Sequence, residues 1–152
     1  MSTRLRRSRF SAPAPSSAVG PSIVLVPADL VSLGVVRAAL ERALGDEGWD
    51  AESAARVVLA VAEAAANAVE HGSDPGALVE VNVRVRGAEA RVRVVDSGRA
   101  DGPHPPTVIA PPPPDALRGR GLVIMQGLAQ HLEVRSHGGG TEVIMEFHRR
   151  AA

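Results

Sequence analysis

The chain has 152 residues, 45% of them hydrophobic, and its 17 basic residues balance 17 acidic ones. This length predicts one domain with a sizeable core, and zero net charge with very few aromatic residues argues against direct nucleic-acid binding. The sequence contains no cysteine and no lysine, which excludes disulfides, thiolate metal sites and lysine-dependent chemistry, and no apolar stretch is long enough to span a bilayer. These features fit a cytoplasmic protein without a membrane segment.

The N-terminal segment, residues 1–21, combines four arginines with a stretch rich in Ser, Ala and Pro. Its apolar content is too low for it to fold alone, so we expect a flexible tail. A targeting or membrane-surface role is the alternative, since an Arg- and Ser-rich start without acidic residues resembles a transit peptide. The apolar core of a secretory signal is missing.

Regular structure is expected from residue 22 onward. A short strand is predicted over 22–27, and Asp29 is expected to cap a helix that runs to about Gly45. The residues of its apolar stripe are Leu30, Leu33, Val36, Leu40 and Leu44. Arg37 lies at the edge of this stripe, where its stem is expected to pack while its head reaches water or a partner.

A second helix is predicted from Asp50, its N-cap, to Gly72, a typical C-terminal glycine. Helical spacing places four polar residues on one face: Glu63, Asn67, Glu70 and His71. The face expected to pack against the core carries Val58, Ala62, Ala65 and Val69. Because a buried helix rarely carries such a polar face, we expect this face to take part in function.

The C-terminal half alternates between strands and one helix. Alternating valines predict a strand over 79–85, and residues 90–95 predict its hairpin partner. A proline-rich irregular segment, 96–118, then has the length of a lid or binding loop. Apolar residues with helical spacing follow at Leu122, Met125 and Leu128, and residues 132–135 and 141–148 predict a final hairpin. This order predicts an α+β two-layer sandwich, with helices on one face of a mostly antiparallel sheet.

Four motifs in this order resemble the ATP-binding (Bergerat) domain of the GHKL superfamily, over about residues 22–148. Glu63, Asn67 and His71 match its N box, and Asp96-Ser97-Gly98 matches its first glycine box. Gly119-Arg120-Gly121-Leu122 matches the second glycine box, and Thr141 matches the terminal threonine element. Within this superfamily, the chain resembles the compact bacterial anti-sigma factor serine kinases. This resemblance implies a single ATP-binding domain over 22–150 with a lid at about 97–118.

Two helix residues have roles implied by this resemblance. Asn67 supplies a neutral oxygen suited to Mg²⁺, although an Asn could also bond a neighbouring loop. Glu63 is placed as the general base for an attacking serine hydroxyl, and the alternative is an outward carboxylate paired with Arg56. His71 is expected to cap the helix or to sit in the core, and Glu70 to be solvated.

The remaining site residues are expected to hold the nucleotide. Asp96 would accept a hydrogen bond from the adenine amino group, Gly98 would let the base approach the backbone, and Thr141 would support the same site. A plain strand-end turn is the alternative for Asp96 to Gly98. The backbone at the start of the third helix would meet phosphate oxygens, and two arginines could add charge there, or simply be solvated. These residues are Arg118, Gly119, Arg120, Gly121 and Leu122.

The first glycine box departs from the family pattern, since Ala100 stands where a second glycine is usual and Gly102 is displaced. The run of prolines at 111–114 also stiffens the expected lid. These departures leave kinase turnover less secure than ATP binding.

The resemblance implies an ATP- and Mg²⁺-dependent kinase that phosphorylates a serine on an anti-anti-sigma (STAS-type) partner and regulates a sigma factor. It also suggests a homodimer. The alternative is a non-catalytic module that binds nucleotide or sequesters protein. An ATPase driving a conformational change is a third possibility, which the short chain does not favour.

Overall fold

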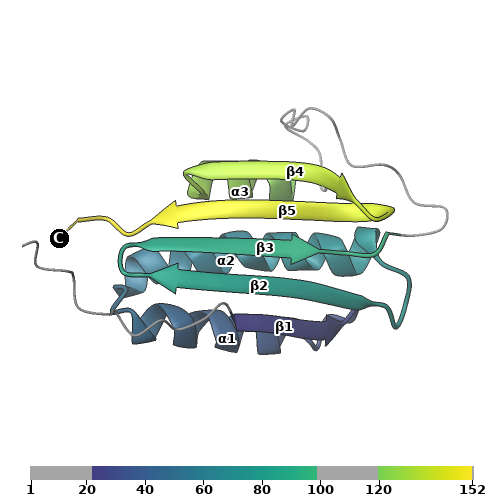
Figure 1. Ribbon diagram of the computed structural model, residues 1–152, viewed down its shortest axis with the longest axis horizontal. Coiled ribbons are helices and arrows are strands. Elements are labelled where there is room, and N and C mark those ends of the chain that lie inside the picture. Colours follow the sequence, from purple (N-terminus) through teal and green to yellow (C-terminus); the bar gives the residue numbers. More distant parts are fainter. Residues whose placement is uncertain (1–21, 99–119, 152) are drawn as a thin grey trace, which may run out of the picture.

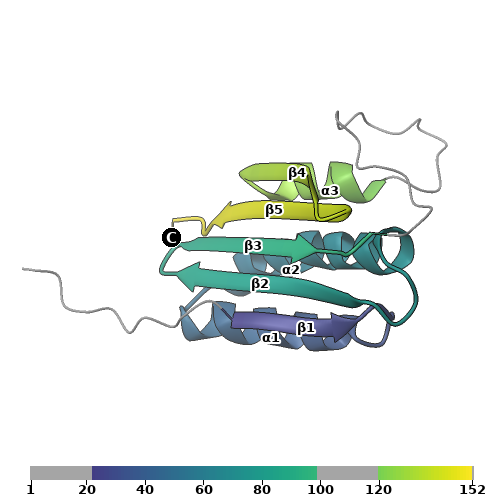
Figure 2. The same cartoon turned by 45° about the vertical axis from the view of Figure 1, so that its right-hand side comes forward.

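The structure, a computed structural model, describes residues 22–98 and 120–151. In this part of the chain, helices lie on one face of a five-stranded sheet and the opposite face is open (Figure 1 and Figure 2). The strands are β1 Ser22–Pro27, β2 Leu78–Arg86, β3 Glu89–Val95, β4 His131–His137 and β5 Gly140–His148. The helices are α1 Leu33–Asp46, α2 Ala51–Asn67 and α3 Arg120–Leu128, and a π-helical turn, η1 Ala68–Gly72, extends α2. None of these described helices has the length and apolar character needed to cross a membrane.

The sheet has the order β1-β2-β3-β5-β4, and all neighbouring strands are antiparallel. Alternate residues of β2 and β3 are buried, because successive side chains of a strand point to opposite faces. The core between sheet and helices is almost entirely aliphatic, and Trp49 and Phe147 are its aromatic members. This two-layer arrangement confirms the predicted α+β class.

The first helix starts later than the sequence predicted. Asp29 accepts a hydrogen bond from the backbone N–H of Ser32 (2.7 Å), but it does so in the turn before α1. Leu30 is 61% exposed and therefore lies outside the apolar stripe. The other stripe residues are buried or packed against the core, as expected: Leu33, Val36, Leu40 and Leu44.

The expected packing of the Arg37 stem is not observed. Its side chain is 69% exposed and forms an ion pair with Glu41 one helical turn later (2.9 Å). An (i, i+4) pair on an exposed helix face contributes little to stability. Arg37 therefore belongs to the solvated face of α1.

The second helix begins as predicted, since the carboxylate of Asp50 accepts a hydrogen bond from the Ser53 N–H (2.8 Å). Its packed face follows the prediction at Val58, Ala65 and Val69, whereas Ala62 is exposed. The buried apolar residues of α2 and η1 are Val57, Ala60, Val61, Ala64, Ala65, Ala68 and Val69. An alanine-rich helix is apolar on most of its circumference, so the contacts with the sheet and the flanking helices decide which residues are buried.

The end of this helix also differs in detail. The chain leaves the helical conformation after Gly72, as predicted, but Gly72 does not have the positive φ of a typical C-terminal glycine. Gly72 is the last residue of a π-helical turn, and such turns are frequent at functional sites. The need for glycine at residue 72 must therefore come from its neighbours in space.

The tight turn between β2 and β3 is attached to the segment between α1 and α2. The indole Nε1 of Trp49 donates a hydrogen bond to the carbonyl oxygen of Gly87 (2.8 Å), and the carboxylate of Glu47 accepts one from the Gly87 N–H (2.7 Å). Arg149 reaches the same segment through the carbonyl oxygen of Gly48 (2.6 Å). These contacts fix the hairpin end of the sheet relative to the helices.

Candidate functional site

Asp96 follows the last residue of β3 and is only 6% exposed. Its Oδ1 atom accepts hydrogen bonds from the backbone N–H groups of Gly98 (2.9 Å) and Thr141 (3.0 Å). Its own backbone N–H donates to the carbonyl oxygen of Thr141 (3.0 Å). Burial raises the pKa of Asp96 above its ordinary value, and the two hydrogen bonds oppose this shift. The carboxylate is thus anchored through Oδ1, and no described hydrogen bond in residues 22–98 and 120–151 uses Oδ2.

Gly72 lies against the free side of this carboxylate. A Cβ atom at residue 72 would stand 2.5 Å from the Cγ atom of Asp96 and would overlap Oδ2. The next residue, Ser73, forms a parallel β-bridge with Gly98. The end of the α2–η1 segment and the end of β3 therefore meet here, and this contact explains the glycine that was interpreted from the sequence as a helix terminator.

The turn between β4 and β5 closes the other side of Asp96. A Cβ atom at Gly140 would lie 2.6 Å from the backbone N of Gly98, and one at Gly98 would lie 2.8 Å from the carbonyl carbon of Gly139. Gly98 also has a φ of +77°, which side chains rarely tolerate. Its requirement for glycine thus has a structural reason that the sequence did not reveal.

The polar face of α2 meets the start of α3. Glu63 and Asn67 lie one helical turn apart, on the side of α2 that faces Gly121, the second residue of α3. A Cβ atom at Gly121 would lie 3.1 Å from Glu63 Oε2 and 3.1 Å from Asn67 Nδ2. Residues of the N box and of the second glycine box, distant in the chain, are thereby brought into contact.

The alternative role for Glu63, an ion pair with Arg56, is not observed. The guanidinium of Arg56 instead donates a hydrogen bond to the carbonyl oxygen of Leu128, the last residue of α3 (3.0 Å). This bond satisfies one of the free carbonyl groups at a helix C-terminus. Among the described residues, no hydrogen bond or ion pair of Glu63 is found.

His71 lies outside the core. No hydrogen bond between His71 and Asp96 is found among the described residues. The side chain of His71 is 55% exposed, and its Nε2 atom lies 3.7 Å from Glu70 Oε2. Of the two roles expected for His71, the core position is therefore wrong. Glu70 has a side chain that is 52% exposed, which confirms that it is solvated.

Some of the remaining predicted residues are described by the structure, and the others lie outside the described residues. Leu122 packs against the core, and Arg120 is exposed at the first position of α3. Thr141 contributes through its backbone groups, by the bonds to Asp96, rather than through a described hydroxyl contact. Outside the described residues lie Arg118, Gly119, Ala100, Gly102, the expected lid and the N-terminal tail.

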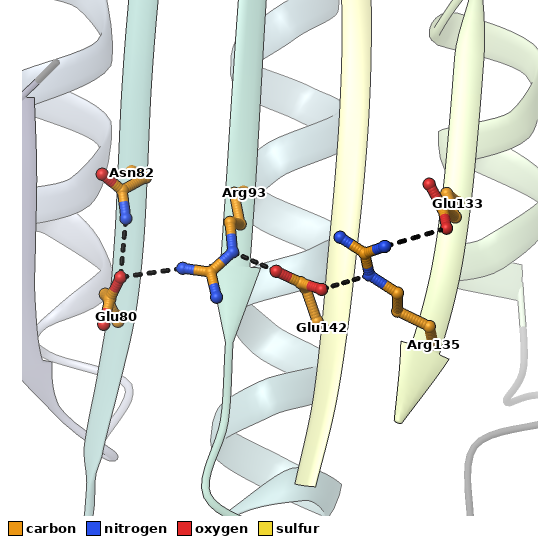
Figure 3. Close-up of polar contacts among 6 residues, drawn as sticks. All are labelled: Glu80, Asn82, Arg93, Glu133, Arg135 and Glu142. Carbon is orange, nitrogen blue, oxygen red and sulfur yellow. Dashed lines mark hydrogen bonds and ion pairs between the residues drawn. The ribbon is translucent and has the colours of Figure 1, made fainter. Parts of the chain in front are cut away.

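A ladder of charged side chains crosses the open face of the sheet beside this site (Figure 3). Its members alternate in sign from β2 to β4, in the order Glu80, Arg93, Glu142, Arg135 and Glu133. Glu142, next to Thr141 in the chain, is only 3% exposed and bonds both arginines. The ladder ties four strands together at the end of the sheet that carries Asp96.

The pKa of Glu142 reflects two opposing effects. Burial raises the pKa, but the hydrogen bonds and charges of Arg93 and Arg135 outweigh it, so the pKa lies below the ordinary value of 4.5. The ladder was not predicted from the sequence, because opposite charges on different strands become neighbours only once the strand register is known.

The donor set on α2 fits a hard metal ion that is shared with a phosphorylated ligand. Within residues 22–98 and 120–151, no group of three or more His, Asp or Glu side chains is placed to hold a metal. Mg²⁺ commonly takes one or two protein oxygen ligands and completes its shell with phosphate oxygens and water. The side-chain oxygen of Asn67, beside Gly121 at the start of α3, could serve such an ion.

Comparison with known proteins gives this geometry a context. A family model described as a histidine kinase-like ATPase domain matches residues 26–147. The chain is also similar to the serine-protein kinase RsbW of Bacillus velezensis, with 27% identity over 135 residues that cover 80% of this chain and 82% of the relative.

One solved structure shares the fold of this chain. The RsbU and RsbW domains of Rv1364c from Mycobacterium tuberculosis match with a TM-score of 0.66 and 24% identity, over 88% of this chain and 34% of that one. This chain therefore spans about a third of that protein. A blue-light activated histidine kinase of Erythrobacter litoralis matches with a TM-score of 0.48 and 23% identity, over 82% of this chain and 42% of that one. The family model covers most of the described fold and confirms the GHKL resemblance: the chain belongs to the histidine kinase-like ATPase domain family.

Proposed function

We propose that this protein is an ATP- and Mg²⁺-dependent serine/threonine kinase that acts on an anti-anti-sigma partner of the STAS type and also binds a sigma factor. The observation that carries this proposal is the contact of Glu63 and Asn67 with Gly121 at the start of α3. It places a carboxylate and an amide beside the N-terminal end of a helix, where phosphate groups bind well. The similarity to a serine-protein kinase, RsbW, supports the same reaction class.

In this proposal Asn67 is the metal ligand and Glu63 is the general base. The bound Mg²⁺ would neutralise phosphate charge, as in other phosphoryl-transfer enzymes. Glu63 would accept the proton of the attacking serine hydroxyl while the new oxygen–phosphorus bond forms. Its lack of a described partner supports this role, because a carboxylate already engaged by Arg56 could not orient a hydroxyl as readily.

Asp96 would recognise the adenine through Oδ2, the oxygen that is left after Oδ1 has been used by Gly98 and Thr141. An acceptor in this position suits the exocyclic amino group of adenine and disfavours guanine, which presents a carbonyl oxygen at the equivalent position. Gly72 would keep this oxygen accessible, since any larger residue would overlap it.

The backbone at the start of α3 would bind the phosphates. Without side chains, Gly119 and Gly121 would leave the amide groups accessible to phosphate oxygens, and Arg118 and Arg120 would add positive charge near the γ-phosphate. We also propose a homodimer, as the family resemblance suggests, with the sigma factor and the anti-anti-sigma protein as alternative partners.

The test is phosphoryl transfer to a candidate STAS partner in the presence of labelled ATP and Mg²⁺. The wild-type protein should form phosphoserine on the partner. Glu63→Gln should lower the transfer rate by about 10²–10⁴-fold, the usual contribution of a general base, while ATP affinity stays within a few-fold. Glu70→Gln is the matched control, because Glu70 is exposed on the same segment, and it should transfer at the wild-type rate.

Two results would contradict the assignment. If wild-type protein binds ATP but forms no phosphoserine at high protein concentration, the domain is a non-catalytic nucleotide-binding module. If Glu63→Gln loses ATP affinity in proportion to transfer, Glu63 binds the nucleotide and is not the base.

A further inference from the structure

The charges on the open face of the sheet are paired at one end and mismatched at the other. At the Asp96 end, the ladder from Glu80 to Glu133 alternates in sign across the strands. Toward the turn between β2 and β3, Arg84 lies directly opposite Arg91 on the neighbouring strand. Like charges directly opposite each other in an antiparallel pair are destabilising, so this arrangement calls for a counter-charge.

The described residues supply part of that counter-charge, since Glu89 lies opposite Arg86 in the strand register. Arg91 lies 3.6 Å from Glu146, and both side chains are substantially exposed. In residues 22–98 and 120–151, Arg84 and Arg86 form no ion pair. Three guanidinium groups thus face the same region with one weak ion pair among them.

A cavity of about 420 Å³ lies at this point. Arginines from β2 and β3, together with residues of β5, line it: Arg84, Arg86, Glu89, Ala90, Arg91, Glu146, Phe147 and His148. It is a half-open groove, and its volume is comparable with that of small-molecule sites, roughly 300–1,000 Å³. Figure 1 shows the turn between β2 and β3 at the end of the sheet opposite the tip of β3, after which Asp96 follows.

We propose that this cavity binds a small phosphorylated molecule, whose phosphate is held by Arg84, Arg86 and Arg91. A guanidinium group matches a phosphate with two parallel hydrogen bonds, and a dianion can neutralise two opposed arginines at once. Glu89 and Glu146 at the same cavity suit hydroxyl groups of the ligand and disfavour an extended acidic peptide. This site is separate from the nucleotide site, and the inference does not depend on the proposed kinase reaction.

Thermal unfolding provides the test, with inorganic phosphate as the first probe, titrated against sodium chloride at constant ionic strength. Trp49 is the only tryptophan of the chain and bonds Gly87, next to Arg86, so its fluorescence reports on this end of the sheet. A ligand present at about five times its dissociation constant should raise the midpoint temperature of thermal unfolding by roughly 2–4 °C. Arg84→Gln and Arg91→Gln should abolish this rise.

Arg42→Gln is the matched control, because Arg42 is exposed on α1 and the substitution removes the same charge elsewhere. It should keep the full rise in midpoint. In phosphate-free buffer, Arg84→Gln should unfold at or above the wild-type temperature, since it removes a like-charge contact. A lower midpoint in that buffer would contradict the argument from Arg84 and Arg91.

A second probe, glycerol 1-phosphate, distinguishes the source of the phosphate. If glycerol 1-phosphate raises the unfolding midpoint more than inorganic phosphate does at equal concentration, the ligand is a phosphate ester. If it raises the midpoint less, the ligand is free phosphate. Equal rises in the wild type and in all three variants would overturn the proposal, because the anion would then act elsewhere. The proposal would also fail if neither inorganic phosphate nor glycerol 1-phosphate raised the unfolding midpoint, while a hexaglutamate peptide raised it in the wild type but not in Arg84→Gln.

Discussion

Gly72 and Asp96 are packed so closely that a methyl group at residue 72 would overlap the carboxylate oxygen Oδ2. Gly72 ends the η1 turn and Asp96 follows β3, so the contact joins the helical layer to the sheet at the candidate site. Since Oδ1 is already bonded by Gly98 and Thr141, this contact determines how the remaining oxygen is presented.

Gly72→Ala should therefore impair nucleotide binding. The added methyl group must displace Asp96, whose position is fixed by backbone bonds on the other side. We expect ATP affinity to fall at least about tenfold and the free energy of unfolding to fall by about 1–3 kcal/mol, the usual cost of overpacking. Isothermal titration with ATP and urea denaturation measure the two effects.

Gly45→Ala is the control for that variant. Gly45 lies in α1 without a positive φ, and no atom lies within 4 Å of the place that an added methyl group would take, so alanine should raise stability by up to about 1 kcal/mol. Unchanged ATP affinity in Gly72→Ala would show that Asp96 is not needed for binding.

Gly121→Ala tests the contact between α2 and α3. The new Cβ atom would lie 3.1 Å from side-chain atoms of both Glu63 and Asn67, which are flexible enough to shift. We expect a small change in stability, under about 1 kcal/mol, and a larger loss of Mg²⁺-dependent ATP binding. Gly127→Ala, later in the same helix and with open space around it, should retain binding. Equal losses in both variants would show that any change in α3 is harmful.

The pH dependence of stability should reveal the buried carboxylate of Asp96. Its pKa is raised in the folded state, so the folded protein holds this proton more tightly than the unfolded chain does. The contribution of Asp96 to stability is full below pH 3.8 and is lost as the pH rises through the raised pKa. The free-energy difference between wild type and Asp96→Asn should therefore shift against the wild type with rising pH. Urea denaturation followed by Trp49 fluorescence measures this difference, and a shift in favour of the wild type would rule out the raised pKa.

Glu142 should show the opposite pH dependence. Its pKa is lowered, so its contribution to stability is present above the ordinary value of 4.5 and is lost as the pH falls through the lower folded value. At pH 7, Glu142→Gln should reduce the free energy of unfolding by about 1–3 kcal/mol, because two guanidinium groups lose their anion. The cost should shrink below pH 4.5 in denaturation experiments.

Glu133→Gln is the matched control for Glu142. Glu133 ends the same ladder, but its side chain is 44% exposed and its ion pair with Arg135 is long, at 3.4 Å. Its replacement should cost less than about 1 kcal/mol at neutral pH. Similar costs for the two variants would mean that burial does not strengthen the Glu142 contacts.

Much of the architecture could be predicted from the sequence because it depends on local pattern. The alternating valines of β2, the Asp50 cap of α2 and the glycines between β4 and β5 each act over a few residues, and each prediction is confirmed. The order of these elements was enough to predict helices on one face of an antiparallel sheet. The four motifs likewise indicated the family, since residue types and spacing are visible in the chain itself.

The wrong predictions concern residues for which both a buried and an exposed position were chemically possible. Leu30 has the right spacing for the stripe of α1, but the helix starts after it. Ala62 could have packed, yet it is exposed, because an alanine-rich helix is apolar on most of its circumference and alanine imposes almost no preference. His71 could have been buried, and it is exposed beside Glu70.

Local spacing along the chain specifies the elements, their order and the residue types available for phosphate and metal chemistry. Folding in three dimensions decides that Gly72 faces Asp96, that Gly121 touches Glu63 and Asn67, and that Glu142 lies between two arginines. Contacts of this kind depend on strand register and on how helices pack, where a shift of one residue exchanges the two faces of a strand. Such contacts between distant segments have no signature in a single chain until it is folded.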